Sequence, residues 1–187
     1  MQSDHLTLIS HTVLALIGRH GASPHDLVRL MRRGRIYHAA AASQYYAEPK
    51  RLERLGLLTS SREPGRTRER TVYRLTDAGV AALEEWVGHP SPFPRLAGEP
   101  PARIISAEVT GEGAVRDSLL AMRAEMAELR ANAEELEQQA STMPHREKYL
   151  LLNARLAKQV LMAYERWLDE VDQELAPERE SAARRSA

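Results

Sequence analysis

The chain has 187 residues, of which 43% are hydrophobic and 28% are charged, so it can form one large globular domain or two small ones. It contains no cysteine, which excludes disulfides, thiolate metal sites and cysteine nucleophiles, and no run of 18 apolar residues predicts a membrane span. The formal net charge is zero, yet residues 29–74 carry twelve Lys and Arg against four acidic residues, a local charge of +8.

The first two predicted helices lie close to the N-terminus. Residues 6–19 place apolar side chains with the spacing of one helical face. Ser23 and Pro24 are typical of a helix start, and they open a second helix that Gly34 ends. The stretch before the first helix lacks the layout of a signal peptide, so we expect a cytoplasmic protein.

A third helix is predicted over residues 39–55, where four alanines favour helix formation. Pro49 lies inside this stretch, and a proline removes one backbone hydrogen bond and clashes with the preceding turn. The sequence leaves two possibilities. The helix is kinked near Tyr45, or it begins late and residues 39–46 form a separate turn.

The following segment predicts a hairpin and a fourth helix. Residues 57–61 and 71–75 are strand candidates, the second being β-branched and aromatic with alternating polarity. Between them, residues 62–70 form a basic hairpin tip that contains Pro64, Gly65 and four arginines. Thr76 caps the helix that follows, over residues 77–87.

The clearest boundary is a segment rich in proline. Residues 88–101 contain five prolines and two glycines, and a short apolar segment follows at 104–109. We therefore predict a first domain over 1–88, a linker with the short apolar segment over 89–112, a helical domain over 113–176, and a disordered tail over 177–187.

The C-terminal half predicts two long helices. Residues 113–143 carry apolar side chains at alternating spacings of four and three, a heptad pattern that needs a partner helix. The second helix, over 145–175, has two apolar stripes and must be covered on more than one side. These patterns predict coiled-coil-like pairing in a homodimer, with the dimerisation residues Leu119, Met122, Met126, Leu129, Leu136, Leu156, Val160 and Trp167.

The order of the N-terminal elements predicts a winged helix-turn-helix, so the fold class is mainly α with a small two-stranded wing and a C-terminal helical domain. In such a domain the third helix enters the major groove, where base edges can be read. The wing lies on the flanking backbone or minor groove, where arginine meets phosphate. Because salt screens charges beyond about 8 Å, a polyanion would feel the local +8 block, although a solvated surface with chance clustering would look the same.

Two sequence stretches resemble one family of regulators. Residues 43–57 contain Ser-Gln-Tyr-Tyr and then Lys-Arg-Leu-Glu-Arg-Leu-Gly-Leu, which is similar to the third helix of the PadR-like family. Residues 72–79, Val-Tyr-Arg-Leu-Thr-Asp-Ala-Gly, are similar to its second wing strand and following helix start, a pattern that MarR-like regulators share. The long C-terminal helices favour the longer PadR-like type. This resemblance implies a homodimer that binds a palindromic operator, usually to repress, and a possible small aromatic effector.

The predicted DNA contacts come from the third helix, the wing and the second helix. Gln44 can read adenine, Ser43 can contact phosphate or base, and Tyr45 lies beside them. The phosphate-binding candidates are Lys50 and Arg51 on the third helix, Arg66, Arg68 and Arg70 on the wing, and Arg32 and Arg35 after the second helix. Tyr46 and Leu52 are expected in the core.

Other functions are less well supported by the sequence. The seven histidines have no metal-ligand spacing, so we predict no metal site and no cofactor. Trp86 and Trp167 could line a ligand cavity, although core packing or an interface is the simpler interpretation for Trp167. The sequence contains no phosphate-binding loop and no nucleophile–base spacing, so we predict that the protein is not an enzyme. A coiled-coil interaction module whose basic hairpin binds an acidic protein is the alternative function.

Overall fold

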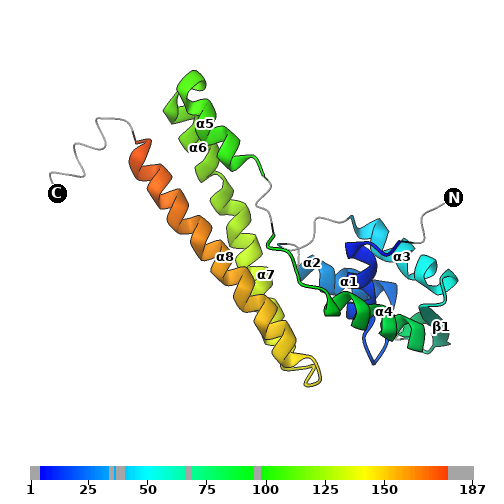
Figure 1. Ribbon diagram of the computed structural model, residues 1–187. Coiled ribbons are helices and arrows are strands. Elements are labelled where there is room, and N and C mark those ends of the chain that lie inside the picture. The colour runs from blue at the N-terminus through cyan, green and yellow to red at the C-terminus, as the bar shows by residue number, and fades with distance from the viewer. Residues whose placement is uncertain (1–4, 34–35, 37–40, 66–68, 95–97, 177–187) are drawn as a thin grey trace. The chain divides into compact units, whose positions relative to one another are not determined.

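The computed structural model describes residues 5–33, 36, 41–65, 69–94 and 98–176, and the chain divides into two compact units, Met1–Phe93 and Pro94–Ala187 (Figure 1). The first unit contains α1 (Leu8–Ile17), α2 (Pro24–Arg33), α3 (Ala42–Arg54), β1 (Leu58–Glu63), β2 (Arg70–Leu75) and α4 (Asp77–Gly88). The second contains α5 (Pro100–Thr110), α6 (Glu112–Leu120), α7 (Met122–Ala140) and α8 (Glu147–Glu174). The predicted fold class, helical with a two-stranded wing, is confirmed.

The core of the first unit is built from the inward faces of three helices and the two strands. Its fully buried side chains include Val13, Leu14 and Ile17 of α1 and Leu27 of α2. Removing such side chains from water is the main stabilising term of a small domain, at roughly 25 cal/mol per Å² of apolar surface. These buried contacts therefore fix the arrangement of the three helices.

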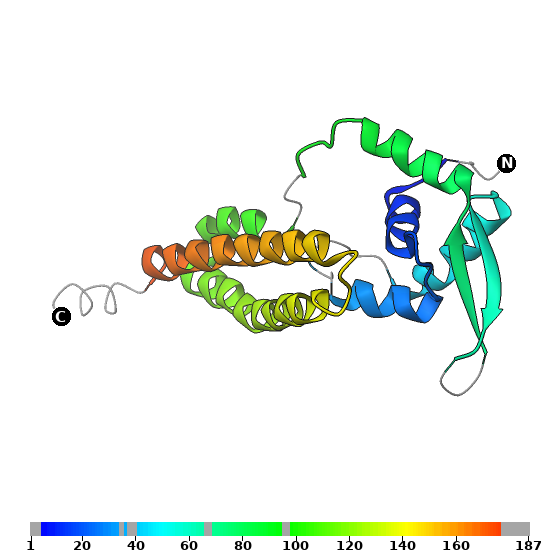
Figure 2. The same cartoon turned by 90° about the horizontal axis from the view of Figure 1, so that it is seen from below.

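The wing is an antiparallel hairpin that is anchored to the segment before α2. Strands β1 and β2 pair from Leu58 opposite Leu75 to Glu63 opposite Arg70 (Figure 2). Ala22 forms an isolated antiparallel bridge to the other edge of β2. Its N–H donates to the Tyr73 carbonyl at 3.0 Å and its carbonyl accepts from the Tyr73 N–H at 2.9 Å. The root of the wing is thereby fixed to the domain core.

Thr76 connects the wing to α4. Its hydroxyl accepts from the Gly79 N–H at 3.1 Å, as an N-cap does, and donates to the Gly56 carbonyl at 2.7 Å. Gly79 lies so close to the preceding turn that a β-carbon on it would meet the Leu57 carbonyl oxygen at 2.1 Å. The first turn of α4 can pack against this turn only because position 79 has no side chain.

In the second unit, the first helix begins where the sequence predicts linker. Pro100 and Pro101 occupy the first positions of α5, where a missing N–H leaves no helical hydrogen bond unmade. The predicted linker and short apolar segment, 89–112, thus include a helix of 11 residues. Gly111, with φ of 91°, separates α5 from α6.

The long heptad stretch packs against α8 of the same chain. It is interrupted at Ala121, between α6 and α7, and both of these helices contact α8 (Figure 1). Leu119, Met126 and Leu136 are buried within the single chain. Their assignment to dimerisation is therefore corrected: they form the core of a helical hairpin, because α8 supplies the partner helix that the heptad pattern requires.

The remaining predicted dimerisation residues are less buried. Leu156 on α8 is 50% exposed, while Met122, Leu129, Val160 and Trp167 are half-buried in the chain. The pattern identified apolar helix faces, but it did not distinguish the face that packs within the chain from the face that remains outside.

Four ion pairs flank the hairpin core. Their members on α6 and α7 recur every seven residues, and their partners on α8 run in the opposite direction. The pairs are Arg116–Asp172 at 2.6 Å, Arg123–Asp169 at 2.7 Å, Arg130–Glu165 at 2.5 Å and Glu137–Lys158 at 2.5 Å. Because most of these groups are partly exposed, each pair contributes little stability by itself, but together they specify an antiparallel register.

Replacing Gly79 by Ala should lower the free energy of unfolding by about 1–3 kcal/mol, because the new β-carbon overlaps the Leu57 carbonyl and the turn must shift. Urea unfolding followed by circular dichroism measures the change. Gly88→Ala is the matched control in the same helix, where a β-carbon meets nothing within 4 Å. It should be neutral or stabilising by up to about 1 kcal/mol. Equal stability of the two variants would show that the contact at Gly79 is not tight.

Candidate nucleic-acid interface

Helix α3 presents one face to the core and the opposite face to solvent. Tyr45, Pro49 and Leu52 are buried, and their spacing of four and three places them on one side of the helix. The helix is continuous from Ala42 through Pro49, so the late start that the sequence allowed is wrong. The outward face carries the exposed residues Ser43, Gln44, Tyr46, Ala47, Lys50 and Arg54.

The burial of the two adjacent tyrosines is the reverse of the prediction. Tyr45, predicted to contact DNA, is 2% exposed, and burial raises the pKa of its hydroxyl. This assignment is corrected: Tyr45 supports α3 from inside. Tyr46, expected in the core, is 46% exposed and lies on the outward face, whereas Leu52 is in the core as predicted. A shift of one residue rotates a helical position by about 100°, so one error in phase exchanges the two rings.

A buried polar contact links α1 to the inner side of α3. Ser10, which is fully buried, donates its hydroxyl hydrogen to Glu48 Oε1 at 2.7 Å. Arg51 Nη1 donates to the same oxygen at 2.9 Å, and Arg51 Nη2 donates to the His5 carbonyl at 3.1 Å. Arg51 was predicted to clamp phosphate. The structure instead uses its guanidinium to connect α3 with the segment before α1.

Between the C-terminal half of α3 and the wing lies a polar cleft of about 530 Å³. We call it the α3–wing cleft, and its lining consists of Lys50, Glu53, Arg54, Ser60, Ser61, Arg62, Thr71 and Tyr73. Ser60 donates to Glu53 Oε1 at 2.6 Å, and burial, with the nearby Glu53 carboxylate, raises the pKa of Tyr73. Lys50 and Arg54 form no ion pair with any residue that the structure describes. Three cations, four hydroxyl groups and one carboxylate thus line the cleft.

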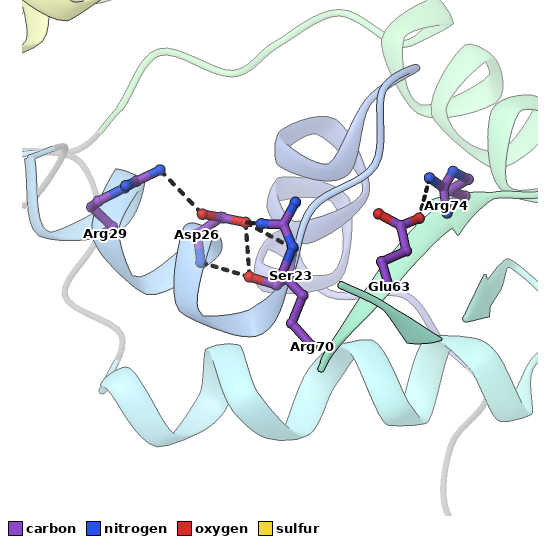
Figure 3. A network of polar contacts seen from close by, with 6 residues as sticks. All are labelled: Ser23, Asp26, Arg29, Glu63, Arg70 and Arg74. Carbon is purple, nitrogen blue, oxygen red and sulfur yellow. Dashed lines mark hydrogen bonds and ion pairs between the residues drawn. The ribbon is translucent and has the colours of Figure 1, made fainter. Parts of the chain in front are cut away.

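The other side of the wing is neutralised by carboxylates (Figure 3). Arg70 donates to Asp26 Oδ2 at 3.2 Å, and Arg74 pairs with Glu63 and donates to the Ser61 hydroxyl at 2.8 Å. The hydrogen bond and charge of Arg74 hold the pKa of Glu63 below its usual value. Arg70, predicted to contact DNA, is therefore already paired within the protein.

The structure places the remaining predicted residues as follows. Arg32 is exposed on α2, while Arg35, Arg66 and Arg68 lie outside the described residues. Ser43, Gln44 and Lys50 share the outward side of α3. The sequence analysis missed Arg54 and Arg62. Arg54 could have been found, because it lies one helical turn beyond Lys50 on the same face.

Across the described ranges, no three His, Asp or Glu side chains gather as a metal site. No helix within these ranges is both long and apolar enough to cross a membrane.

No family model matches the sequence, and no curated protein matches it significantly. Solved structures do resemble the chain. The virulence activator AphA of Vibrio cholerae is 25% identical, with a TM-score of 0.71 over 89% of this chain and 97% of that one. PadR of Bacillus subtilis, solved with operator DNA, is 23% identical, with a TM-score of 0.66 over 90% of this chain and 100% of PadR.

A PadR-like transcriptional regulator of Bacillus cereus is 15% identical, with a TM-score of 0.66 over 91% of this chain and 99% of that one. The likeness thus spans both units. A winged helix followed by a long helical hairpin is the fold that the chain shares with these structures. In fold the chain is similar to PadR and to this PadR-like regulator, as the resemblance in its third helix and wing predicts.

Proposed function

We propose that this protein is a sequence-specific DNA-binding transcriptional regulator. The observation that carries the proposal is the outward side of α3, where Lys50 and Arg54, beside the α3–wing cleft, have no ion-pair partner among the described residues. Cations of this kind bind phosphate and fix the position of a protein on a duplex. Ser43 and Gln44, in the first turn of α3, are then placed to read base edges in the major groove.

The likeness to PadR, which was solved with operator DNA, supports this function over the alternative of a protein-interaction module. We also propose that the regulator represses transcription. This proposal rests on the family resemblance alone, because AphA has a similar fold and is named as an activator. A reporter gene whose promoter carries the selected binding site should fall in expression when the protein is present, and a rise would identify an activator.

A homodimer is the proposed binding form, because a two-fold symmetric protein matches a palindromic operator. The outer side of α8 supports it. Tyr149, Leu152 and Leu156 are between 50% and 60% exposed and follow one another at helical spacing. Contiguous apolar surface of this kind marks an association site. The proposed dimer contact thus moves from the heptad stretch to this outer side of α8.

An effector site is proposed in the second unit, where an apolar cleft of about 470 Å³ lies between α5 and α8. Its lining includes Pro101 and Ile104 from α5 and Tyr164 and Trp167 from α8, whose rings meet edge to face with centroids 6.2 Å apart. This volume is within the range of about 300–1,000 Å³ typical of small-molecule sites. PadR was solved with p-coumaric acid, which supports a small aromatic compound as the ligand class.

The DNA proposal is tested by selecting from random duplex DNA and then measuring affinity against salt concentration. Enrichment of a palindrome is expected. Each phosphate contact contributes about 0.9 to the slope of log affinity against log salt, so Lys50→Gln combined with Arg54→Gln should make the slope shallower by up to about 1.8. Arg19→Gln, an exposed arginine on the segment after α1, is the control and should leave the slope unchanged. Absence of salt-dependent binding by the wild type would refute the function.

The dimer contact is tested by Leu152→Glu combined with Leu156→Glu. Two charges on a buried apolar contact are strongly unfavourable, so this variant should become monomeric by sedimentation equilibrium while its helical circular dichroism is retained. Gln173→Glu adds a charge to an exposed position of the same helix and should remain dimeric. A double variant that stays dimeric would place the contact elsewhere.

The effector site is tested with p-coumaric acid as the probe. Addition of the compound should quench tryptophan fluorescence and weaken DNA binding, and Trp167→Ala should lose both effects. Trp86→Phe is the control, because Trp86 lies in the first unit, stacked on His11. If Trp167→Ala responded like the wild type, the cleft would not be the effector site.

A further inference from the structure

Asp26 accepts hydrogen bonds from three residues, Ser23, Arg29 and Arg70. It lies in the first turn of α2, where Oδ2 accepts from the Ser23 N–H at 3.2 Å and from the Ser23 hydroxyl at 2.7 Å. Oδ1 accepts from Arg29 at 3.1 Å, and Oδ2 also accepts from Arg70 at 3.2 Å (Figure 3). The carboxylate is thus held in place by a helix start and shared by two guanidinium groups.

Arg70 comes from a distant part of the chain. It is the first residue of β2, and it stands opposite Glu63, the last residue of β1, at the end of the wing nearest the tip. Three residues further along the strand, Tyr73 is hydrogen-bonded to Ala22, which directly precedes Ser23. The backbone bridge and the Asp26–Arg70 pair therefore attach β2 to α2 at two points.

We propose that Asp26 withholds Arg70 from the DNA backbone and so limits the sequence-independent part of DNA affinity. This inference rests on the proposed DNA-binding function. Contacts between cations and phosphates carry most of non-specific binding, so one arginine withheld lowers affinity for all sequences alike. Base contacts from α3 are untouched, so the affinities for the operator and for other DNA fall together and their ratio is unchanged. Asp26 acts in this scheme as a positioning residue.

The geometry explains why Asp26 can compete with phosphate for Arg70. A phosphate offers the same charge as a carboxylate, but Asp26 is already oriented by Ser23 and needs no reorganisation to accept a hydrogen bond. Its side chain is 23% exposed, so its charge is screened less than that of a fully solvated group. The Arg70 side chain is 49% exposed, which keeps it within reach of an alternative partner once Asp26 is removed.

The ionisation of Asp26 keeps this contact present at neutral pH. Burial alone would raise the pKa of its carboxyl, but the hydrogen bonds from Ser23 and the charges of Arg29 and Arg70 outweigh burial and lower the pKa below its usual value. The carboxylate is therefore charged at every pH at which DNA binding is measured.

The two sides of the wing thus differ in the ion pairing of their cations. On one side Arg70 and Arg74 are paired with Asp26 and Glu63. On the other side Arg54 and Lys50 line the α3–wing cleft and form no ion pair within the part of the chain that the structure describes. The pairing restricts the available positive charge to the side where α3 can read bases.

The test compares Arg70→Gln, Asp26→Asn and the double variant, using the salt dependence of affinity for a random-sequence duplex. Arg70→Gln should leave the slope unchanged, because Arg70 makes no phosphate contact in the wild type. Asp26→Asn should steepen the slope by about 0.9, a change of about threefold in relative affinity between 50 and 200 mM salt. The double variant should return to the wild-type slope.

The control is Asp77→Asn, which removes an exposed first-turn carboxylate of α4 and releases no arginine. A slope made shallower by about 0.9 in Arg70→Gln would overturn the inference, because Arg70 would then contact phosphate in the wild type. A double variant as steep as Asp26→Asn would also overturn it, since the effect would not pass through Arg70. Arg70→Gln leaves the Ser23–Asp26 cap intact, so it remains informative if Asp26→Asn unfolds.

Failure of the inference and failure of the proposed function give different results. If the wild type itself shows no salt-dependent retention of DNA, the DNA-binding function fails. If the wild type binds with a steep slope and Arg70→Gln weakens it, only the role of Asp26 fails. An NMR titration without DNA adds a direct readout: Arg70→Gln should raise the pKa of Asp26, and an unchanged pKa would show that the pair does not form in solution.

Discussion

The arrangement of the first unit depends on how the inner side of α3 is buried. Tyr45, Pro49 and Leu52 pack inward, and the Ser10–Glu48 hydrogen bond adds a directional contact that a purely apolar face would lack. A buried polar pair is costly unless both groups are satisfied, so only one rotation of α3 meets this requirement. That rotation decides that Lys50 and Arg54 face outward and that they adjoin the wing. The candidate interface is therefore a consequence of the core.

Much of the fold follows from local sequence patterns, and the failures have a common cause. Capping residues, helical periodicity and strand alternation predicted the winged helix because each depends on neighbours within a few residues. The roles of Arg51 and Arg70 could not be predicted, because their partners His5 and Asp26 lie 46 and 44 residues away in the sequence. Charge counts identify a basic segment, whereas the structure decides which of its cations are already neutralised.

The C-terminal unit shows the same limit for apolar patterns. The heptad spacing correctly predicted a helix that needs a partner, but a repeat cannot specify whether the partner is another subunit or another part of the chain. Here α8 covers Leu119, Met126 and Leu136, and its own outer stripe at Tyr149, Leu152 and Leu156 remains exposed. The prolines that favoured a linker proved compatible with a helix because they occupy its first turn.

The order of charges along the hairpin also disfavours a shift in register between α7 and α8. Arg130 faces Glu165 and Glu137 faces Lys158, so the sign reverses between the last two pairs. If α7 slid by one heptad along α8 in one direction, Arg130 would meet Lys158. In the other direction Glu137 would meet Glu165. An apolar repeat alone tolerates both slips, since Leu and Met would still find apolar neighbours. The order of charges thus disfavours both shifted registers. A hairpin that formed one heptad out of register would contain a like-charge contact, so it would reopen and pair again in the native register.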